Sequence, residues 1–480
     1  MKYVNLMKRL LVAGLFILPT VSFGQSNFLK EYMQSYDSIA NFRYYDQRGI
    51  NVFETPKNNV TFNGLRVRFG AGFTQQFQNL SHSSEAEKNS GTGGNRLYPL
   101  APGFMTAQAN LFTDVQLAEG IRLNVTTYLS SRHHNEAWVK GGYIQIDKFP
   151  FKGKFWNTLS SISTVKVGHM EINYGDEHFR RSDGGQTLYN PFMDNLIMDS
   201  YATEIGGEYY LRYKGFFGML GISGGMIKGN VDSIYMKDVL VDNDTRRSPS
   251  IYLKGGFDKN LMPNLRVRGS ASWYHNSSSA GSGLTLFGGD RTGSNYQNVM
   301  EKGNPETGAL PASTAIAFSG RFNPGMSKAV DAIMLNGFVK FHGLEVFATY
   351  ETAKGYNKAD SVQNKVVKLG TPNKRDANQF AIEGVYRFLK NENLFVGIRY
   401  NTVSARLTDT KAYTWAGNVT VTRMSYSAGW FITKNILLKG EIVNQQYNDF
   451  KYSYKGTGVV DDYRKGGKFN GYVIEAVVGF

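Results

Sequence analysis

Sixteen stretches of the chain place apolar side chains at every second position, and this repeated alternation constrains the fold more than any other feature. In LRVRFGAGF (65–73), five apolar residues share one face, whereas two arginines and two glycines share the other. Successive side chains of a strand point to opposite faces, so each stretch is predicted to be a β-strand. The predicted strands are 62–74, 103–117, 121–131, 137–147, 161–170, 201–213, 216–227, 249–257, 264–275, 329–341, 344–352, 377–389, 394–403, 417–431, 436–448 and 468–480.

The connections between these strands alternate in length. Short turns are predicted around 120, 214–215, 342–343, 390–393 and 433–435, and the long connections include 75–102, 171–200, 228–248, 276–328, 353–376 and 449–467. Short turns at one end and long loops at the other are typical of an outer-membrane barrel with both chain ends in the periplasm. A closed barrel also leaves no unpaired sheet edge in lipid.

The sequence therefore predicts an all-β fold, a transmembrane antiparallel β-barrel of about 16 strands with long extracellular loops. Two observations leave 14 or 18 strands open. The stretch 137–147 alternates poorly, and 312–320 (ASTAIAFSG) could form a further strand.

The N-terminal residues predict export. Three basic residues precede an apolar run at 10–18 that is too short to span a bilayer, and Ser22-Phe23-Gly24 is a small-x-small cleavage signal. We therefore predict a cleaved signal peptide at 1–24. Removing its three basic residues takes the net charge from +15 to +12.

The mature chain is predicted to divide into a periplasmic N-terminal segment at 25–60 and a barrel at 61–480. Apolar residues between 29 and 42 fall near helical spacing, which predicts a short N-terminal periplasmic helix. A plug, an oligomer contact and a simple leader into the barrel all stay open for this segment. The final strand ends on Phe480 and resembles the C-terminal signature that directs bacterial outer-membrane barrels to their insertion machinery.

Enzyme, metal and nucleic-acid signatures are missing from the sequence. There is no GxxxxGK[ST] or HExxH, and no cysteine for a thiolate zinc site. His178 lies near Asp176 and Ser182, but neighbours in sequence do not make a catalytic triad, which is assembled from separate segments. The basic residues are spread along strands rather than clustered. We predict no enzyme, no catalytic residue, no metal, no cofactor and no nucleic-acid partner.

Charged residues on the polar faces of the strands predict a polar lumen. An arginine or lysine at the lipid midplane would cost about 2–4 kcal/mol, so these side chains must face water or one another. The predicted lumen wall includes Arg66, Arg68, Arg122, Arg266 and Arg268. Basic residues outnumber acidic ones on these faces, which favours mild anion preference; pairing across the lumen, with the excess charge in loops, is the alternative.

Three longer stretches and two short features resemble a Bacteroidota outer-membrane porin. They are RGINVFETPKNNVTFNGLRVRFG (48–70), TYLSSRHHNEAWVKGGYIQID (127–147), EINYGDEHFRRSDGGQTLYNPFMDN (171–195), FNPGM (322–326) and the terminal Phe480. The resemblance covers nearly all of the mature chain. It implies a barrel of the porin superfamily, similar to general and phosphate-selective porins, and a homotrimer; it implies no particular solute.

The third long loop, 171–200, is the predicted pore constriction. In sixteen-stranded porins this loop bends into the barrel. Asp176, Glu177, Arg180 and Arg181 would then line the narrowest part of the pore and face Arg66, Arg68 and Arg122 across the lumen. A loop folded over the outside of the barrel is the alternative.

The predicted function is passive diffusion of small hydrophilic solutes through the outer membrane of a Gram-negative bacterium. Membrane lipid and lipopolysaccharide would surround the barrel. A channel selective for oxyanions or saccharides stays open, as does a structural or adhesion barrel whose long loops, 276–328 above all, contact other surfaces.

Overall fold

A computed structural model of the chain describes residues 39–480, apart from 56, 59, 87–96, 106, 131–136, 183, 226–246, 280–282, 291, 304–317, 358, 361–373, 411–412 and 455–460. The predicted signal peptide and most of the predicted N-terminal helix lie outside these residues. Residues 39–42, which belong to the predicted helix, are not helical.

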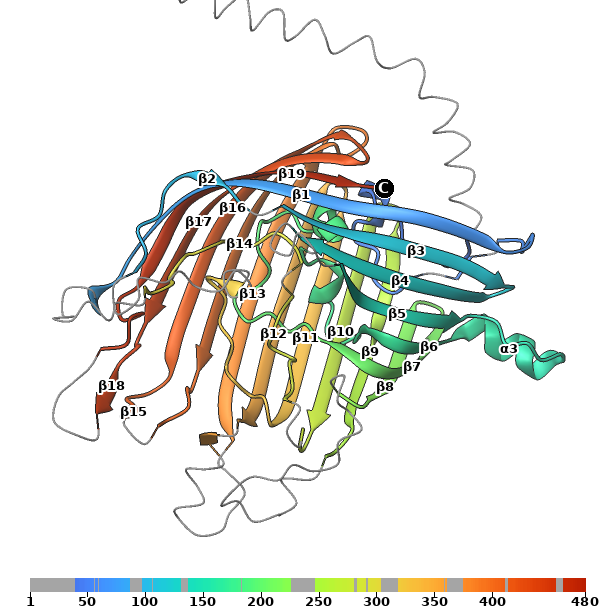
Figure 1. Ribbon diagram of the computed structural model, residues 1–480. Helices are drawn as coiled ribbons and strands as arrows, with labels where there is room; N and C mark the ends of the chain where they lie inside the picture. The colour runs from blue at the N-terminus through green and yellow to red at the C-terminus, as the bar shows by residue number, and fades with distance from the viewer. Residues whose placement is uncertain are drawn as a thin grey trace, which may run out of the picture.

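Sixteen long strands close into one antiparallel barrel, which confirms the predicted fold class and strand number (Figure 1). Each strand pairs with its neighbours in sequence, and the ring closes where β1 pairs with β19 from Gly72↔Gly479 to Ser83↔Lys468. The strands are β1 (Arg66–Ser83), β3 (Gln108–Ala118), β4 (Ile121–Ser130), β5 (Trp138–Ile146), β6 (Ser163–Glu171), β7 (Thr203–Tyr213), β8 (Phe216–Ser223), β9 (Ser250–Met262), β10 (Leu265–Asn276), β11 (Ala329–Phe341), β12 (Leu344–Tyr356), β13 (Arg375–Phe388), β14 (Leu394–Ala405), β16 (Val419–Thr433), β17 (Ile436–Asn448) and β19 (Lys468–Gly479).

The short segment β2 (Gly103–Phe104) adds a two-residue pairing to β1, beside the point where the ring closes.

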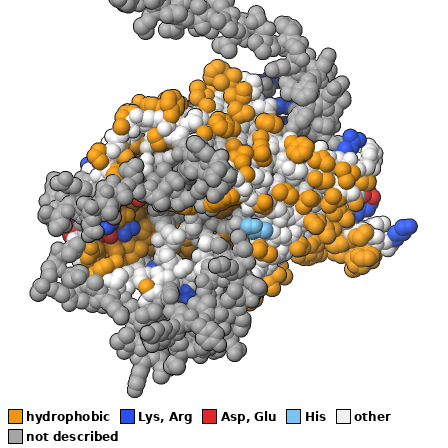
Figure 2. Space-filling view, viewed as in Figure 1, with side chains coloured by type: hydrophobic (Ala, Val, Ile, Leu, Met, Phe, Trp, Pro, Cys, Tyr) orange, Lys and Arg blue, Asp and Glu red, His pale blue; other side chains and the backbone are white. Residues whose placement is uncertain are grey.

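The two faces of each strand differ as the alternation predicts. On β13, Phe380, Ile382 and Tyr386 are exposed on the outside, whereas Gln379 and Glu383 are buried inside. Figure 2 shows hydrophobic side chains over much of the visible barrel wall, with few charged ones among them. An apolar outer face suits hydrocarbon, and the polar side chains are kept within the barrel.

Tight turns join the strands at one end of the barrel. Between β7 and β8 the two turn residues, Lys214 and Gly215, have φ of 50° and 79°. Positive φ at both positions is the geometry of a type I′ turn, which matches the twist of paired strands.

The connection from β5 to β6 lies at the same end but carries a helix, α3 (Lys154–Ile162), that the sequence did not lead us to expect. None of its residues is buried, and it extends past the wall in Figure 1. Among the described residues, no helix reaches the length and hydropathy needed to cross a bilayer.

The long connections lie at the opposite end. There β15 (Tyr413–Trp415) and β18 (Tyr452–Tyr454), from two different loops, pair with each other beyond the wall. The connection after β6 and the described parts of the connection after β10 turn back into the barrel, as does segment 39–57 from the end with short turns.

Candidate functional site

The loop between β6 and β7 lies inside the barrel. It contains two short 3-10 helices, η3 (Glu177–Phe179) and η4 (Gly184–Tyr189). Its backbone amides donate to inward side chains of three separate strands: Met193 to Glu441, Ile197 to Asn401 and Met198 to Gln379. These contacts hold the loop against the wall from β13 to β17.

Arg180 and Arg181 make different buried ion pairs. The Arg180 guanidinium lies 2.5 Å from Glu383 of β13 and also donates to Asn51. Arg181 lies 2.5 Å from Asp199 in its own loop, and its guanidinium stacks 3.8 Å from the centre of the Tyr201 ring. Arg180 therefore ties the loop to the wall, whereas Arg181 holds the loop's own shape.

Asp176 connects the loop to a second part of the wall. Its carboxylate lies 2.7 Å from Lys254 of β9 and 2.7 Å from Arg268 of β10, and it accepts from the Ser270 hydroxyl at 2.8 Å. Burial alone would raise the pKa of Asp176, but the two cations hold it at about 2. Asp176 is therefore ionised, and it anchors the loop to β9 and β10, whereas Arg180 anchors it to β13.

Glu177 differs from the other charged residues of the loop. It is 7% exposed, and among the described residues it makes no ion pair and its Oε1 has no hydrogen-bond partner. Burial raises the pKa of Glu177 to about 7; Glu383 adds to this rise, against the opposite effect of Arg399 and Arg180. Burying an ionised carboxylate without a partner is costly, so the protonated form is favoured.

We expect Glu177→Gln to stabilise the barrel at pH 8 but not at pH 4. The folded-state pKa of about 7 lies above the ordinary value of 4.5, so the stability that the protonated form contributes is lost as pH rises through that range. The difference in unfolding free energy should reach about 3 kcal/mol at pH 8. Urea unfolding of the detergent-solubilised protein measures it. The exposed Glu119→Gln is the control, and an equal effect at both pH values would contradict the assignment.

A second inner segment, residues 39–57, lies across the end of the barrel that carries the tight turns. Its polypeptide reaches opposite sides of the wall: the Tyr45 hydroxyl donates to Asp114 of β3 at 3.0 Å, and Asn51 donates to Glu345 of β12 at 2.6 Å. Within it, the 3-10 helix η1 (Gln47–Gly49) is held to the turn after β16, where the Gln47 amide donates to the Lys434 carbonyl at 2.9 Å. Of the alternatives left open, the described part of this segment has the position of a plug.

The predicted wall arginines occupy three kinds of environment. Arg68, Arg122 and Arg268 are buried inside the barrel, Arg266 is half-buried beside Asp258, and Arg66 is exposed at the start of β1. Arg122 pairs with Asp114 at 3.2 Å.

The expected facing of Arg66, Arg68 and Arg122 with the charges of the 171–200 loop is wrong. The Arg68 guanidinium lies 3.9 Å from the centre of the Phe42 ring, and Arg122 donates to the Asn41 carbonyl at 3.2 Å. Segment 39–57 thus occupies a part of the lumen that was expected to be open. There it contacts Arg68 and Arg122.

The described parts of the connection between β10 and β11 also face inward. Tyr296 and Ser294 donate to Glu441 and Glu475 on the wall, and Arg321 pairs with Asp194 of the 171–200 loop at 2.9 Å. These residues are therefore not available for the surface contacts that an adhesion role would require. The lumen charges face one another and the inserted segments rather than a wide column of water.

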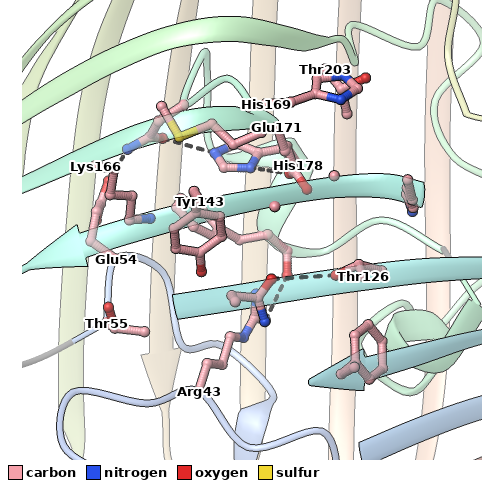
Figure 3. A pocket seen from close by; sticks show the side chains of 18 of the residues that line it. Arg43, Glu54, Thr55, Thr126, Tyr143, Lys166, His169, Glu171, His178 and Thr203 are labelled. Atoms are coloured by element: carbon pink, nitrogen blue, oxygen red, sulfur yellow. Dashed lines mark hydrogen bonds and ion pairs between the residues drawn. The ribbon is translucent and has the colours of Figure 1, made fainter. Parts of the chain in front are cut away.

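A cavity of about 170 Å³ remains between the inner segment, the 171–200 loop and strands β3 to β7. Figure 3 shows Arg43 of the inner segment, Tyr143 of β5 and Lys166 of β6 around it. Its lining includes Phe42, Arg43, Tyr45, Phe112, Arg122, Lys140, Tyr143, Lys166, Glu171, His178, Tyr189 and Tyr210.

Sequence reasoning missed Arg43, Lys140 and Lys166. The alternation of 163–171 could have found Lys166, because it pairs in register with Gln145 and Glu208, which both point inward. Among the described residues, no three His, Cys, Asp or Glu side chains converge as a metal site.

No protein-family model and no curated protein matches the sequence. Solved structures do match in fold. The chain is similar to the anion-selective porin from Comamonas acidovorans, with 9% identity and a TM-score of 0.50 over 87% of this chain and 100% of that one. It is also similar to OmpT, an outer membrane protein of Vibrio cholerae, with 10% identity and a TM-score of 0.47 over 88% and 99%.

A third neighbour is the outer membrane channel DcaP of Acinetobacter baumannii, with 11% identity and a TM-score of 0.44 over 88% and 99%. At these identities the likeness concerns the fold alone. The fold is that of sixteen-stranded outer-membrane barrels.

Proposed function

We propose that the chain is a porin-like channel of the bacterial outer membrane that lets small hydrophilic solutes diffuse passively. The observation that carries this proposal is a closed barrel with an apolar outside and a polar cavity within. The apolar outer surface is compatible with the hydrocarbon of a bilayer. The polar inner surface requires water or a polar solute.

The 171–200 loop, in this proposal, sets the width of the channel together with segment 39–57. Asp176 and Arg180 support it, because their ion pairs hold the loop to two separate parts of the wall, β10 and β13. Glu177 and Arg181 complete the constriction. Solutes would pass along the side of the barrel formed by β3 to β7, where the cavity remains.

A selective channel is the second candidate. The described loops occupy much of the lumen, and the cavity of about 170 Å³ is one of the spaces left between them and the wall. A small, lined passage favours recognition of particular solutes over free passage. A homotrimer in the outer membrane, with lipid and lipopolysaccharide around it, remains the expected assembly.

We expect mild anion selectivity. The net charge is +15 for the full chain, and Arg43 and Lys166 line the cavity. Reconstituting the purified protein in a planar bilayer under a KCl gradient gives the reversal potential, which should take the sign of the chloride equilibrium potential. A reversal potential with the sign of the potassium equilibrium potential would contradict the anion preference. A membrane that never conducts would contradict the proposed channel function.

A further inference from the structure

Two cations at the cavity lack a carboxylate partner. Arg43 donates only to backbone carbonyls, to Gly49 at 2.9 Å and Phe179 at 2.7 Å. The Lys166 ammonium lies over two aromatic rings, 5.2 Å from the centre of Tyr143 and 5.3 Å from that of Tyr210, and makes no hydrogen bond or ion pair with any described residue.

The other charges at the cavity are already matched. Arg122 pairs with Asp114 at 3.2 Å and Lys140 pairs with Asp290 at 2.6 Å. Glu54 is shared by Lys254 and Arg268, and Glu171 contacts His178.

Glu208 is the wall carboxylate in register with Lys166, but it is engaged elsewhere. It accepts hydrogen bonds from the Asn173 amide and the Tyr210 hydroxyl. Lys166 and Arg43 are therefore the two cations of this cavity that no carboxylate of the described residues contacts directly.

Both side chains are half-buried, and a bound anion would give them the charge-assisted contact that no described carboxylate makes. In Figure 3 the Tyr143 ring lies between Lys166 and Arg43. The two charges come from different parts of the fold, the wall and the inner segment. A ligand that extends from one charge toward the other would link segment 39–57 to the barrel wall.

The rest of the lining is aromatic. Phe42, Tyr45, Phe112, Tyr189 and Tyr210 present flat apolar faces, and the tyrosines add hydroxyl groups. Such walls suit a ring with polar edges rather than a bare inorganic ion. A volume of about 170 Å³ is close to that of cavities which hold one six-membered ring.

We propose that this cavity is a binding site for a small organic carboxylate built on a single ring. The carboxylate would pair with Lys166, and the ring would lie against the aromatic side chains on the side toward Arg43. This inference rests on the proposed channel function for the route by which the ligand enters. It adds a chemical class of solute to that function.

Glucuronate tests the inference because it combines a carboxylate with a sugar ring. Calorimetric titration of the full chain in detergent should give measurable binding of glucuronate, with at least tenfold weaker binding of glucose, which lacks the charge, and of inorganic phosphate, which lacks the ring. Equal affinity for phosphate, or no binding of glucuronate, would overturn the proposal.

Substitutions of Lys166 locate the site. Lys166→Met should weaken glucuronate binding about tenfold or more, since it removes a charge-assisted contact. Lys166→Arg keeps the charge and should retain binding, and Lys148→Met at the exposed rim is the matched control. Unchanged affinity in a folded Lys166→Met protein would refute the assignment.

Planar-bilayer conductance of the same preparations separates this inference from the function on which it rests. A protein that conducts but does not bind glucuronate would support the channel function and contradict the proposed binding site. A protein that binds glucuronate but never conducts would support the binding site and contradict the proposed channel function.

Discussion

Glu383→Gln is expected to lower the free energy of unfolding by about 3–5 kcal/mol, the usual cost of breaking a buried ion pair, and to raise single-channel conductance. Glu383 lies 2.5 Å from Arg180 of the 171–200 loop and 2.7 Å from Arg399 of β14. An amide would leave both buried guanidinium groups without their main counter-charge. The loop would lose its anchor on this side and fill less of the lumen.

Glu351→Gln is the matched control for this experiment. Glu351 is also a buried wall carboxylate that holds the same loop region, but its partners are the hydroxyls of Ser200 and Tyr174 rather than cations. An amide can still accept those hydrogen bonds, so stability and conductance should change little. Equal effects of the two substitutions would show that the Arg180 pair has no special role in holding the loop.

Deleting residues 39–57 is expected to raise conductance several-fold, more than any single substitution in the loop. This segment spans the end of the barrel from Asp114 on β3 to Glu345 on β12. Its removal would expose several charged wall side chains to water and widen the passage. Single-channel recording of the deletion protein beside the wild type measures the change; an unchanged conductance would mean that the segment does not limit flow.

A disulfide distinguishes a fixed constriction from a movable plug. The chain has no cysteine, so Gln47→Cys with Lys434→Cys would form one defined bridge. The Gln47 amide donates to the Lys434 carbonyl at 2.9 Å, so the two backbones lie side by side, and loss of free thiols on oxidation shows that the bridge has formed. If the segment is fixed, oxidised and reduced proteins should conduct equally. Loss of conductance on oxidation would show instead that segment 39–57 must move out of the barrel for the channel to conduct.

The barrel could be predicted from the sequence because lipid imposes a local rule on every strand. One face of each strand contacts hydrocarbon and the other faces the lumen. The alternation in 65–73 or 377–389 is therefore visible without any long-range information. Boundaries shifted by several residues, as where β1 continues to Ser83 and β9 to Met262, because a strand can extend past the membrane into polar surroundings.

The interior could not be predicted in the same way. The local sequence of 39–57 does not predict the hydrogen bond between Tyr45 and Asp114. The sequence of the 171–200 loop likewise does not predict the ion pair between Arg180 and Glu383. Such pairings depend on which segments share the lumen. The position of the loop was anticipated only through resemblance to sixteen-stranded porins. The partners of its charges were misjudged because a second segment occupies the space beside it.

Lys166 shows how far the sequence could have gone. Its inward orientation follows from alternation in β6, but its lack of a carboxylate partner depends on Glu208 being engaged by Asn173 and Tyr210. Charge balance inside a barrel is a property of the whole wall. It becomes visible only when the strands are placed in register.

The most direct test of the account is a recording from the purified wild-type protein in a planar lipid bilayer. A passive channel with a narrow, charged lumen should give discrete conductance steps that are small, proportional to voltage and present without any energy source. A protein that inserts as a folded barrel yet leaves the bilayer as insulating as protein-free lipid, under all voltages and salts, would contradict the proposed function.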